Sequence, residues 1–589
     1  FSADGKRLLL SSQRLGAPDA DHFVAEGYQW GELYWTPITG GTLQADLPLP
    51  ATLARPHGER LVYQMPAADQ PFRKHQHSFA VPRLWLFDGK QHKQLTEDRV
   101  AATDPVWSDK GDTLFYLSER SGDFNVWRRD LASGKEQQLT HYQGHPVRGL
   151  SASRNGDLVW SWLGELYRLD AGSSEPRKLT LTPQVASAPD EASEALTLAD
   201  EALISEEADE LILVSEGNLF AVDPERERVR QLTRDPSEQS SPLFAEQGRA
   251  LIYLSEQQGH AALYRLRKGD PDLLFSDPGP LTESLLLAIP DKGISRPVLS
   301  PDGKQLAFVV DGQAIHLLDL ASNKQRELVP ASFNPSRHEV HLAFAPDSRH
   351  LALTFRPDAA EQEIAVIDTA NPKAKPVNVS LNGYQDGQPG WSQDGAILYW
   401  QSTRFGALGP DGEPLVTNLL GIYSSRAARA DAIAELEPPK GGYGFESDRL
   451  NHREALLLQP TGTLLASRII GDQLIYLVEE MGVNSESEIK GYSQDLRKGK
   501  TSELFGEQPG PALASLNQQG TLATLVRDGE ITRIHLDSGE ATSAPFALQP
   551  TGRWQERMTA AFDQIARLTR DEFYLDDMNG VNWDSYVAA

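Results

Sequence analysis

A repeated unit of about 45–53 residues runs through most of the chain and restricts the folds open to it. Each copy holds a polar turn with Asp and Gly, an apolar strand, a second strand ending in Leu-Tyr or Ile-Tyr, then Asp-Leu-x-x-Gly and Arg-x-Leu-Thr. The clearest copy runs from Trp107 to Thr140. Gly5, Gly58 and Gly111, the turn glycines of three copies, are each 53 residues apart. This regularity predicts one structural unit per copy.

Each copy has room for four strands of about five residues joined by tight turns, which is the size of a β-propeller blade. The Asp-Gly turns favour the positive φ angles that hairpins need. A pair of helices would instead show an apolar stripe every 3.6 residues, whereas Leu211–Val214 and Leu251–Leu254 are continuously apolar. The predicted fold class is therefore all-β, built of propeller blades.

Eleven copies are present, which exceeds the 4–8 blades of a single ring. A polar, acidic stretch near residues 183–200 separates four copies from the seven that follow. We predict a first propeller at 1–190 with about four of six blades, a seven-bladed propeller at 196–548 and a truncated helical subdomain at 553–589. The six-blade interpretation implies about 90 further residues before Phe1. The turns of the copies contain Gly5, Gly58, Gly111 and Gly156, then Asp209, Gly248, Gly303, Ser348, Gly395, Gly462 and Gly520.

Composition excludes several classes of function. The formal net charge of −27 argues against binding to nucleic acid and to anionic membrane surfaces. No cysteine is present, so disulfides, thiolate metal sites and cysteine nucleophiles are excluded, and the composition favours the periplasm over the cytoplasm. No run of about 18 apolar residues occurs that could span a bilayer. The sequence predicts no cofactor.

The last 37 residues have a different pattern. Met558, Phe562, Ile565, Thr569 and Phe573 recur at spacings of 4, 3, 4 and 4, which places them on one face of a helix. We expect a helix over residues 554–575 that buries its apolar face against a following domain, with Gly580 breaking it. In this chain alone that helix should be mobile or dock on the propeller rim.

Together these features resemble the tricorn protease family of serine peptidases. Besides the propeller units, three segments carry the resemblance: Phe72–Asp88, similar to an extended loop of the six-blade propeller; Gly442–Arg449, similar to the link after the fifth blade of the seven-blade ring; and Trp554–Trp583, similar to the first helix of the protease core. The resemblance implies substrate-gating propellers, peptide substrates, assembly into hexamers and a catalytic Ser, His and Glu. None of the catalytic segments lies within residues 1–589, so no catalytic residue is assigned.

The alternative is a TolB-like propeller scaffold that binds protein partners and has no peptidase. Such a scaffold has no need of the helix at 554–575, and a continuation of the gene with a His-bearing helix would favour the protease. A prolyl-oligopeptidase-type hydrolase would need Gly-x-Ser-x-Gly, which is absent.

Arg14, Arg120 and Arg404 follow the first apolar strand of their units and are candidates for binding peptide carboxylates, with structural salt bridges as the commoner explanation. His75 and His77 share a face but lack a third ligand, and His338-Glu-Val-His341 has the wrong spacing for a zinc helix, so no metal site is predicted. The remaining candidates are expected to be structural: Asp302, Asp347 and Asp394 in Asx-turns, and Trp35, Trp85, Trp127 and Trp160 in the core between blades.

Overall fold

The repeat unit folds as an antiparallel sheet whose four strands pair in sequence order. The recurring Ser, Asp and Thr residues of the repeat stabilise the turns between these strands by hydrogen bonds to the backbone. Ser108 Oγ accepts a hydrogen bond from the Thr113 amide at 3.1 Å and fixes the turn before the second strand. Asp130 Oδ1 accepts from the Ser133 amide at 2.7 Å, and Thr140 Oγ1 accepts from a backbone amide of the third strand at 2.8 Å. The recurring polar residues therefore hold turns and strand ends in place.

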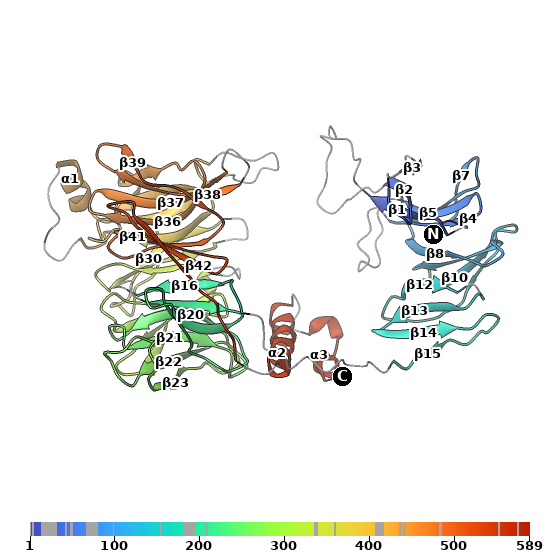
Figure 1. Ribbon diagram of the computed structural model, residues 1–589, viewed down its shortest axis with the longest axis horizontal. Helices are drawn as coiled ribbons and strands as arrows, with labels where there is room; N and C mark the ends of the chain where they lie inside the picture. The colour runs from blue at the N-terminus through green and yellow to red at the C-terminus, as the bar shows by residue number, and fades with distance from the viewer. Residues whose placement is uncertain are drawn as a thin grey trace. The chain divides into compact units, whose positions relative to one another are not determined.

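Two compact units, residues 1–186 and 187–589, make up the chain in the computed structural model (Figure 1). The extents 1–190, 196–548 and 553–589 stay predictions. The structure describes residues 2, 5–12, 32–41, 44–47, 51–65, 81–97, 99–153, 155–181, 195–205, 210–334, 340–357, 361–406, 417–434, 439, 443–481, 486–551, 554–573 and 577–588.

The first unit contains four sheets among its described residues, the first of three strands and the others of four. They are β1 (Arg7–Ser12), β2 (Glu32–Pro37) and β3 (Gln44–Leu47); β4 (Thr52–His57), β5 (Arg60–Met65), β6 (Arg83–Phe87) and β7 (His92–Gln94); β8 (Ala102–Trp107), β9 (Thr113–Ser118), β10 (Asn125–Asp130) and β11 (Glu136–Gln138); β12 (Arg148–Ala152), β13 (Leu158–Trp162), β14 (Glu165–Leu169) and β15 (Arg177–Lys178).

The second unit contains seven four-stranded sheets in its described part. The first four are β16 (Glu201–Ile204), β17 (Leu211–Ser215), β18 (Asn218–Asp223) and β19 (Arg228–Gln231); β20 (Gln239–Ala245), β21 (Ala250–Ser255), β22 (Ala262–Lys268) and β23 (Leu281–Leu287); β24 (Ile294–Leu299), β25 (Gln305–Val310), β26 (Ala314–Asp319) and β27 (Lys324–Val329); β28 (Leu342–Phe344), β29 (His350–Phe355), β30 (Glu363–Asp368) and β31 (Val377–Asn378).

The remaining three sheets complete the second unit. They are β32 (Asp386–Trp391), β33 (Ile397–Ser402), β34 (Asn418–Tyr423) and β35 (Glu454–Leu458); β36 (Thr463–Ile470), β37 (Gln473–Met481), β38 (Ser487–Asp495) and β39 (Lys500–Pro509); β40 (Leu513–Leu516), β41 (Leu522–Arg527), β42 (Glu530–His535) and β43 (Ala541–Pro545). Short helices η1 (Ala331–Phe333), α1 (Arg426–Ala434) and η2 (Leu450–His452) lie between strands.

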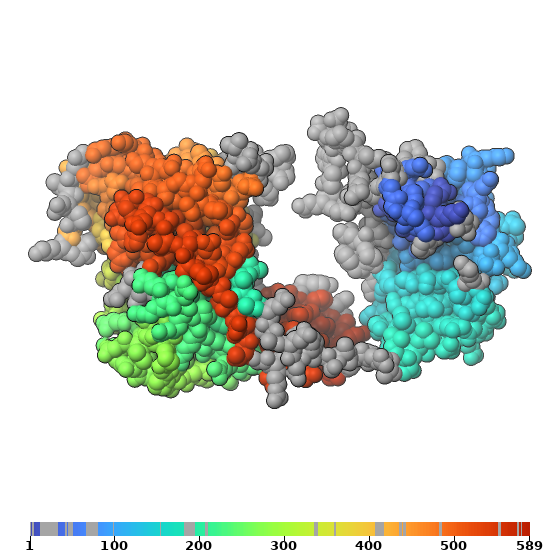
Figure 2. Space-filling model, viewed as in Figure 1, coloured from blue at the N-terminus to red at the C-terminus, as the bar shows by residue number. Residues whose placement is uncertain are grey.

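The seven sheets close into a ring. The first strands of neighbouring sheets contact one another, so they lie innermost. A buried apolar cluster fills each gap between successive sheets, and one such cluster joins the last sheet to the first through Val526, Ile531, Leu211 and Phe220. Leu196 and Leu548 pair across the same closure, and Figure 2 shows the red-orange last sheet against the green first sheet. The predicted all-β fold of consecutive propellers with seven blades in the second is confirmed.

One predicted landmark is wrong. The stretch 443–449 was expected after the fifth blade of the second ring, but it lies inside that blade, between β34 and β35. Arg453 explains the excursion: its buried guanidinium donates to the carbonyls of Tyr423 and Asp448 at 2.9 Å each, and also to that of Glu446. The segment therefore returns to the same sheet. The stretch 72–80 lies outside the described residues, and 83–87 forms β6.

Candidate functional site

The C-terminal segment folds as two helices, α2 (Trp554–Glu572) and α3 (Trp583–Val587), with η3 (Met578–Gly580) between them. The predicted helix is confirmed over 554–572, and it ends before Gly580 rather than at it. We call α2 and α3 the tail helices. Helix α2 has 19 residues and is longer than α1, which has nine, so this segment differs from the strands before it as its sequence indicated.

The motif Gly-Val-Asn-Trp folds the tail helices onto each other. Gly580 has a φ of +77°, in the left-handed region that glycine tolerates best. Asn582 caps α3, because its side-chain oxygen accepts from the Ser585 amide at 3.1 Å. Trp583 then donates its indole N–H to the Ala566 carbonyl of α2 at 2.9 Å. Helix α3 was not predicted from the sequence, although the Asn cap is a signal that could have indicated it.

The polar face of α2 docks on the rim of the seven-sheet ring. Arg567 pairs with Glu256 at 2.5 Å, and both side chains are largely buried. Arg557 and Gln564 contact two further rim glutamates, Glu216 and Glu238. The docking that the sequence suggested for this helix is thus present, and it is made by charges rather than by the apolar stripe.

The apolar face of α2 is open to solvent. Met558, Phe562, Ile565 and Leu568 are between 39% and 64% exposed. Single exposed apolar residues are ordinary, but a stripe along one helix face marks a surface that binds another surface. The tail helices therefore combine a polar face fixed to the propeller with an apolar face left for a partner.

Replacing Arg567 by glutamate is expected to release α2 from the rim. The change places two carboxylates together at a largely buried contact and should cost about 3 kcal/mol of docking free energy. Hydrogen exchange over 554–572 should rise in Arg567→Glu and return towards the original in the double variant Arg567→Glu, Glu256→Arg. The control Arg497→Glu disrupts a pair with Asp472, far along the chain, and should leave exchange in α2 unchanged. Unaltered protection of α2 in Arg567→Glu would contradict this docking mode.

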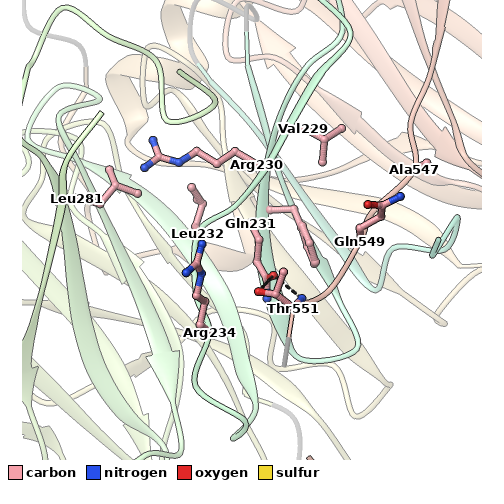
Figure 3. A pocket seen from close by; sticks show the side chains of 10 residues that line it. Val229, Arg230, Gln231, Leu232, Arg234, Leu281, Ala547, Gln549 and Thr551 are labelled. Atoms are coloured by element: carbon pink, nitrogen blue, oxygen red, sulfur yellow. Dashed lines mark hydrogen bonds between the residues drawn. The ribbon is translucent and has the colours of Figure 1, made fainter. Parts of the chain in front are cut away.

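A groove of about 580 Å³ lies where the chain leaves the ring and crosses its first sheet. Figure 3 shows Gln231 of β19 facing Thr551 of the exit segment, and Gln231 Oε1 accepts from the Thr551 amide and hydroxyl at 2.7 Å each. Arg230 is held by the Gly279 carbonyl at 2.6 Å. These contacts tie the exit segment to the outer strands, so the groove positions the tail helices.

The inner strands carry a repeated irregularity at the ring axis. Register shifts interrupt the pairing of β20, β24 and β32, and each holds one residue with positive φ: Ser241, Arg296 and Gln388. Such bulges redirect side chains and backbone groups. Glu201 of β16 accepts from the Ser241 amide at 2.9 Å. Burial raises the pKa of Glu201, and Arg296 opposes the rise from two sheets away, so charges of both signs lie near the axis.

The structure places two of the three candidate arginines in contacts within their own sheets. Arg120 pairs with Glu136 at 2.5 Å and lies over the Trp127 ring at 4.3 Å. Arg404 pairs with Glu454 at 2.6 Å. Both contacts are structural salt bridges that join strands of one sheet. A role of these arginines in substrate binding stays a prediction. Arg14 lies outside the described residues.

The other sequence candidates are largely structural. Asp302, Asp347 and Asp394 each accept a backbone amide two residues ahead, as predicted for Asx-turns. Trp160 is fully buried between the third and fourth sheets, and Trp85 and Trp127 pack against neighbouring clusters, while Trp35 lies in β2 beside Arg7. His341 lies directly before β28, while His75, His77 and His338 lie outside the described residues.

Two kinds of feature are absent from the described residues. No group of three or more His, Asp or Glu side chains in that part of the chain could hold a metal ion. None of its helices is long and apolar enough to cross a membrane.

Comparison with known proteins gives a match to a family model and matches of fold. The family model described as "Tricorn protease C1 domain" matches residues 555–588, which are the tail helices. The crystal structure of the tricorn protease matches 100% of this chain and 56% of that chain, at a TM-score of 0.69 and 13% identity. This chain therefore spans little more than half of the length of that protein, and their likeness is one of fold.

Weaker matches cover little more than half of this chain. A putative TolB from Agrobacterium tumefaciens is 15% identical over 56% of this chain and 98% of that chain, at a TM-score of 0.30. An oligogalacturonate lyase from Vibrio parahaemolyticus is 13% identical over 60% of this chain and 96% of that chain, at a TM-score of 0.29. No curated protein sequence matches the chain.

Proposed function

We propose that this tricorn-like chain, which has the fold of the tricorn protease and a C1 segment, is the substrate-gating and scaffolding part of a serine peptidase that degrades unfolded peptides. The tail helices carry the proposal. They match the C1 family model, and they present an apolar stripe that the propellers themselves leave uncovered. A propeller that only bound protein partners would have no use for such a segment.

The ring suits the gating part of this role. A propeller encloses a narrow axial passage between its inner strands, and a folded domain is far wider than that passage. An extended peptide exposes backbone groups and side chains of all kinds, and the inner strands offer it Glu201, Arg296 and irregular backbone. Passage along the axis would restrict the enzyme to unfolded chains.

The chemistry proposed for the whole enzyme is acyl transfer through a serine, with a histidine base and an oxyanion hole. Those groups would come from segments outside residues 1–589, packed on the apolar face of α2. The rim contacts of Arg557 and Arg567 would fix that core relative to the ring. Assembly into hexamers belongs to the same proposal, which requires no cofactor.

Residues 1–589 produced alone are expected to cleave no peptide. The measurement is hydrolysis of an unstructured fluorogenic peptide by this chain and by the product of the gene continued past Ala589. The continued product should show turnover and the chain alone none. Turnover by the chain alone that a single alanine substitution abolishes would overturn the assignment of catalysis elsewhere. A stop codon directly after Ala589 would favour the TolB-like scaffold instead.

A further inference from the structure

Two acidic residues are buried together at the junction of the fourth and fifth sheets of the ring. Glu363 is the first residue of β30 and is 3% exposed, and Asp386 is the first residue of β32 and is 1% exposed. Carboxylates are almost never fully buried unless they are paired with a cation. In the described part of the chain, neither carboxyl has an ion-pair partner.

Several other sheets hold uncharged residues at the corresponding strand starts, although β14 and β42 begin with Glu165 and Glu530, and β16 begins with Glu201. The third strand begins with an asparagine in three sheets and with an alanine in two, whereas β30 begins with Glu363. The first strand of the second sheet begins with Gln239, where the fifth has Asp386. The fold therefore does not need a carboxyl at either place. The neutral residues are Asn125, Asn218, Asn418, Ala262 and Ala314.

Hydrogen bonding connects the two carboxyls through the same loop. Asn382 donates its side-chain amide to Asp386 Oδ2 at 2.9 Å and its backbone amide to Glu363 Oε2 at 3.4 Å. The Ser380 hydroxyl contacts Glu363 Oε2 and also faces Asp386, and it accepts from the Ile364 amide at 2.9 Å. A hydroxyl has one proton to donate. Gly383 also donates its amide to Glu363 Oε1 at 2.9 Å, whereas among the described residues Asp386 Oδ1 is buried without a hydrogen-bond partner, as suits a carboxyl that carries a proton.

The charged groups around the pair do not neutralise it. Arg404 lies just beyond Ser402, whose hydroxyl faces Asp386, but its guanidinium pairs with Glu454 at 2.6 Å. Arg356 follows the residue that pairs with Glu363 in the register of β29 and β30, and it makes no ion pair with either carboxyl. Glu361 lies beside Gly383 of the loop and adds negative charge. Two ionised carboxylates in this environment would repel each other without compensation.

We propose that Asp386, buried beside Glu363 without a cation, holds a proton and thereby forms a pH-sensitive latch between the fourth and fifth sheets, beneath the loop that exposes Leu381 and Tyr384. When the pair is protonated, the hydrogen bonds through Ser380 and Asn382 are all satisfied. When both carboxyls are ionised, their repulsion favours opening of residues 380–386. The latch is separate from the proposed peptidase role and does not depend on it.

The direction of the pH effect follows from the titration of Asp386. Burial first, and the Glu363 charge in addition, raise the pKa of Asp386 from 3.8 to about 6. The closed latch therefore binds a proton that the open loop does not bind between these two values. Its extra stability is complete below about pH 3.8 and is lost as the pH rises through about 6.

The first test is hydrogen exchange of residues 380–386, corrected for intrinsic rates, from pH 4.5 to 7.5. In the original chain the opening equilibrium constant should fall by about tenfold per pH unit below pH 6. In Asp386→Asn the pH dependence should disappear, with protection at pH 7 equal to or above the original, whereas in Glu363→Gln it should persist and move to lower pH, because burial is the larger cause of the raised Asp386 pKa. The control Asp537→Asn changes an exposed aspartate and should keep the original profile.

The second test is infrared spectroscopy of the folded chain, which reads the proton directly. The original chain at pH 5 should show the carbonyl band of a buried protonated carboxylic acid, and Asp386→Asn should remove it. Absence of that band, or a pH profile unchanged in Asp386→Asn, would overturn the proposal. So would added Ca²⁺ or Mg²⁺ restoring protection at pH 7, because that result assigns the carboxyls to a cation.

Discussion

Replacing Trp160 by alanine is expected to lower the free energy of unfolding of residues 1–186 by about 3–5 kcal/mol. The indole is fully buried in the cluster that joins the third and fourth sheets, beside Val126, Val147 and Leu158. Its removal leaves a cavity that neighbouring strands cannot close, since both sheets are held by their own backbone pairing. The measurement is denaturant unfolding of the chain followed by a probe in each unit.

The effect should be confined to the first unit. Its apolar clusters and those of 187–589 share no residue, so the transition of the second unit should keep its midpoint. Ile38→Ala provides a control, because Ile38 is exposed and its loss should change stability by less than about 0.5 kcal/mol. An equal loss of stability in both units after Trp160→Ala would show that the two unfold together.

Replacing Arg453 by methionine is expected to destabilise the second unit by about 3 kcal/mol. Arg453 is 2% exposed, and its guanidinium is the donor for three backbone carbonyls in and beside the excursion between β34 and β35. Methionine keeps most of the apolar stem but leaves those carbonyls without a donor. Hydrogen exchange over 443–449 should rise together with the loss in unfolding free energy.

Arg426→Ala is the matched control for that experiment. Arg426 pairs with Glu446 of the same excursion at 3.2 Å, but its side chain is well exposed. An exposed pair contributes about 0–1 kcal/mol, so this change should be small. If Arg426→Ala and Arg453→Met had equal effects, the buried donor would not be what holds the excursion.

Much of the architecture followed from local patterns. The turn motif of the repeat positions a serine or aspartate oxygen against its own backbone, as Ser108 and Asp130 do, and such short-range hydrogen bonds form whatever the rest of the chain does. The count of seven sheets after the acidic stretch and the helix at 554–572 were therefore predictable. Asn382 lies in an ordinary turn sequence, and nothing in that sequence indicated its contacts with Glu363 and Asp386.

The candidate site depended on contacts between residues far apart in the chain. The sequence marked the apolar stripe of α2 but not that its Arg567 meets Glu256, and it singled out Arg120 and Arg404, whose carboxylate partners lie on other strands. The sequence pattern placed residues 443–449 after the fifth blade, because it does not reveal that Arg453 holds this excursion within the sheet.

The sequence by itself determined the repeat, the strand-and-turn content of each copy and the helical tail, because spacing and turn chemistry act over a few residues. Only the tertiary structure decided which charges meet: Arg567 with Glu256 on the rim, and Glu363 with Asp386 between two sheets. Docking of α2 on the rim brings the first pair together, and packing of the fourth sheet against the fifth brings the second. Their burial or pairing depends on distance in space, which no local pattern encodes.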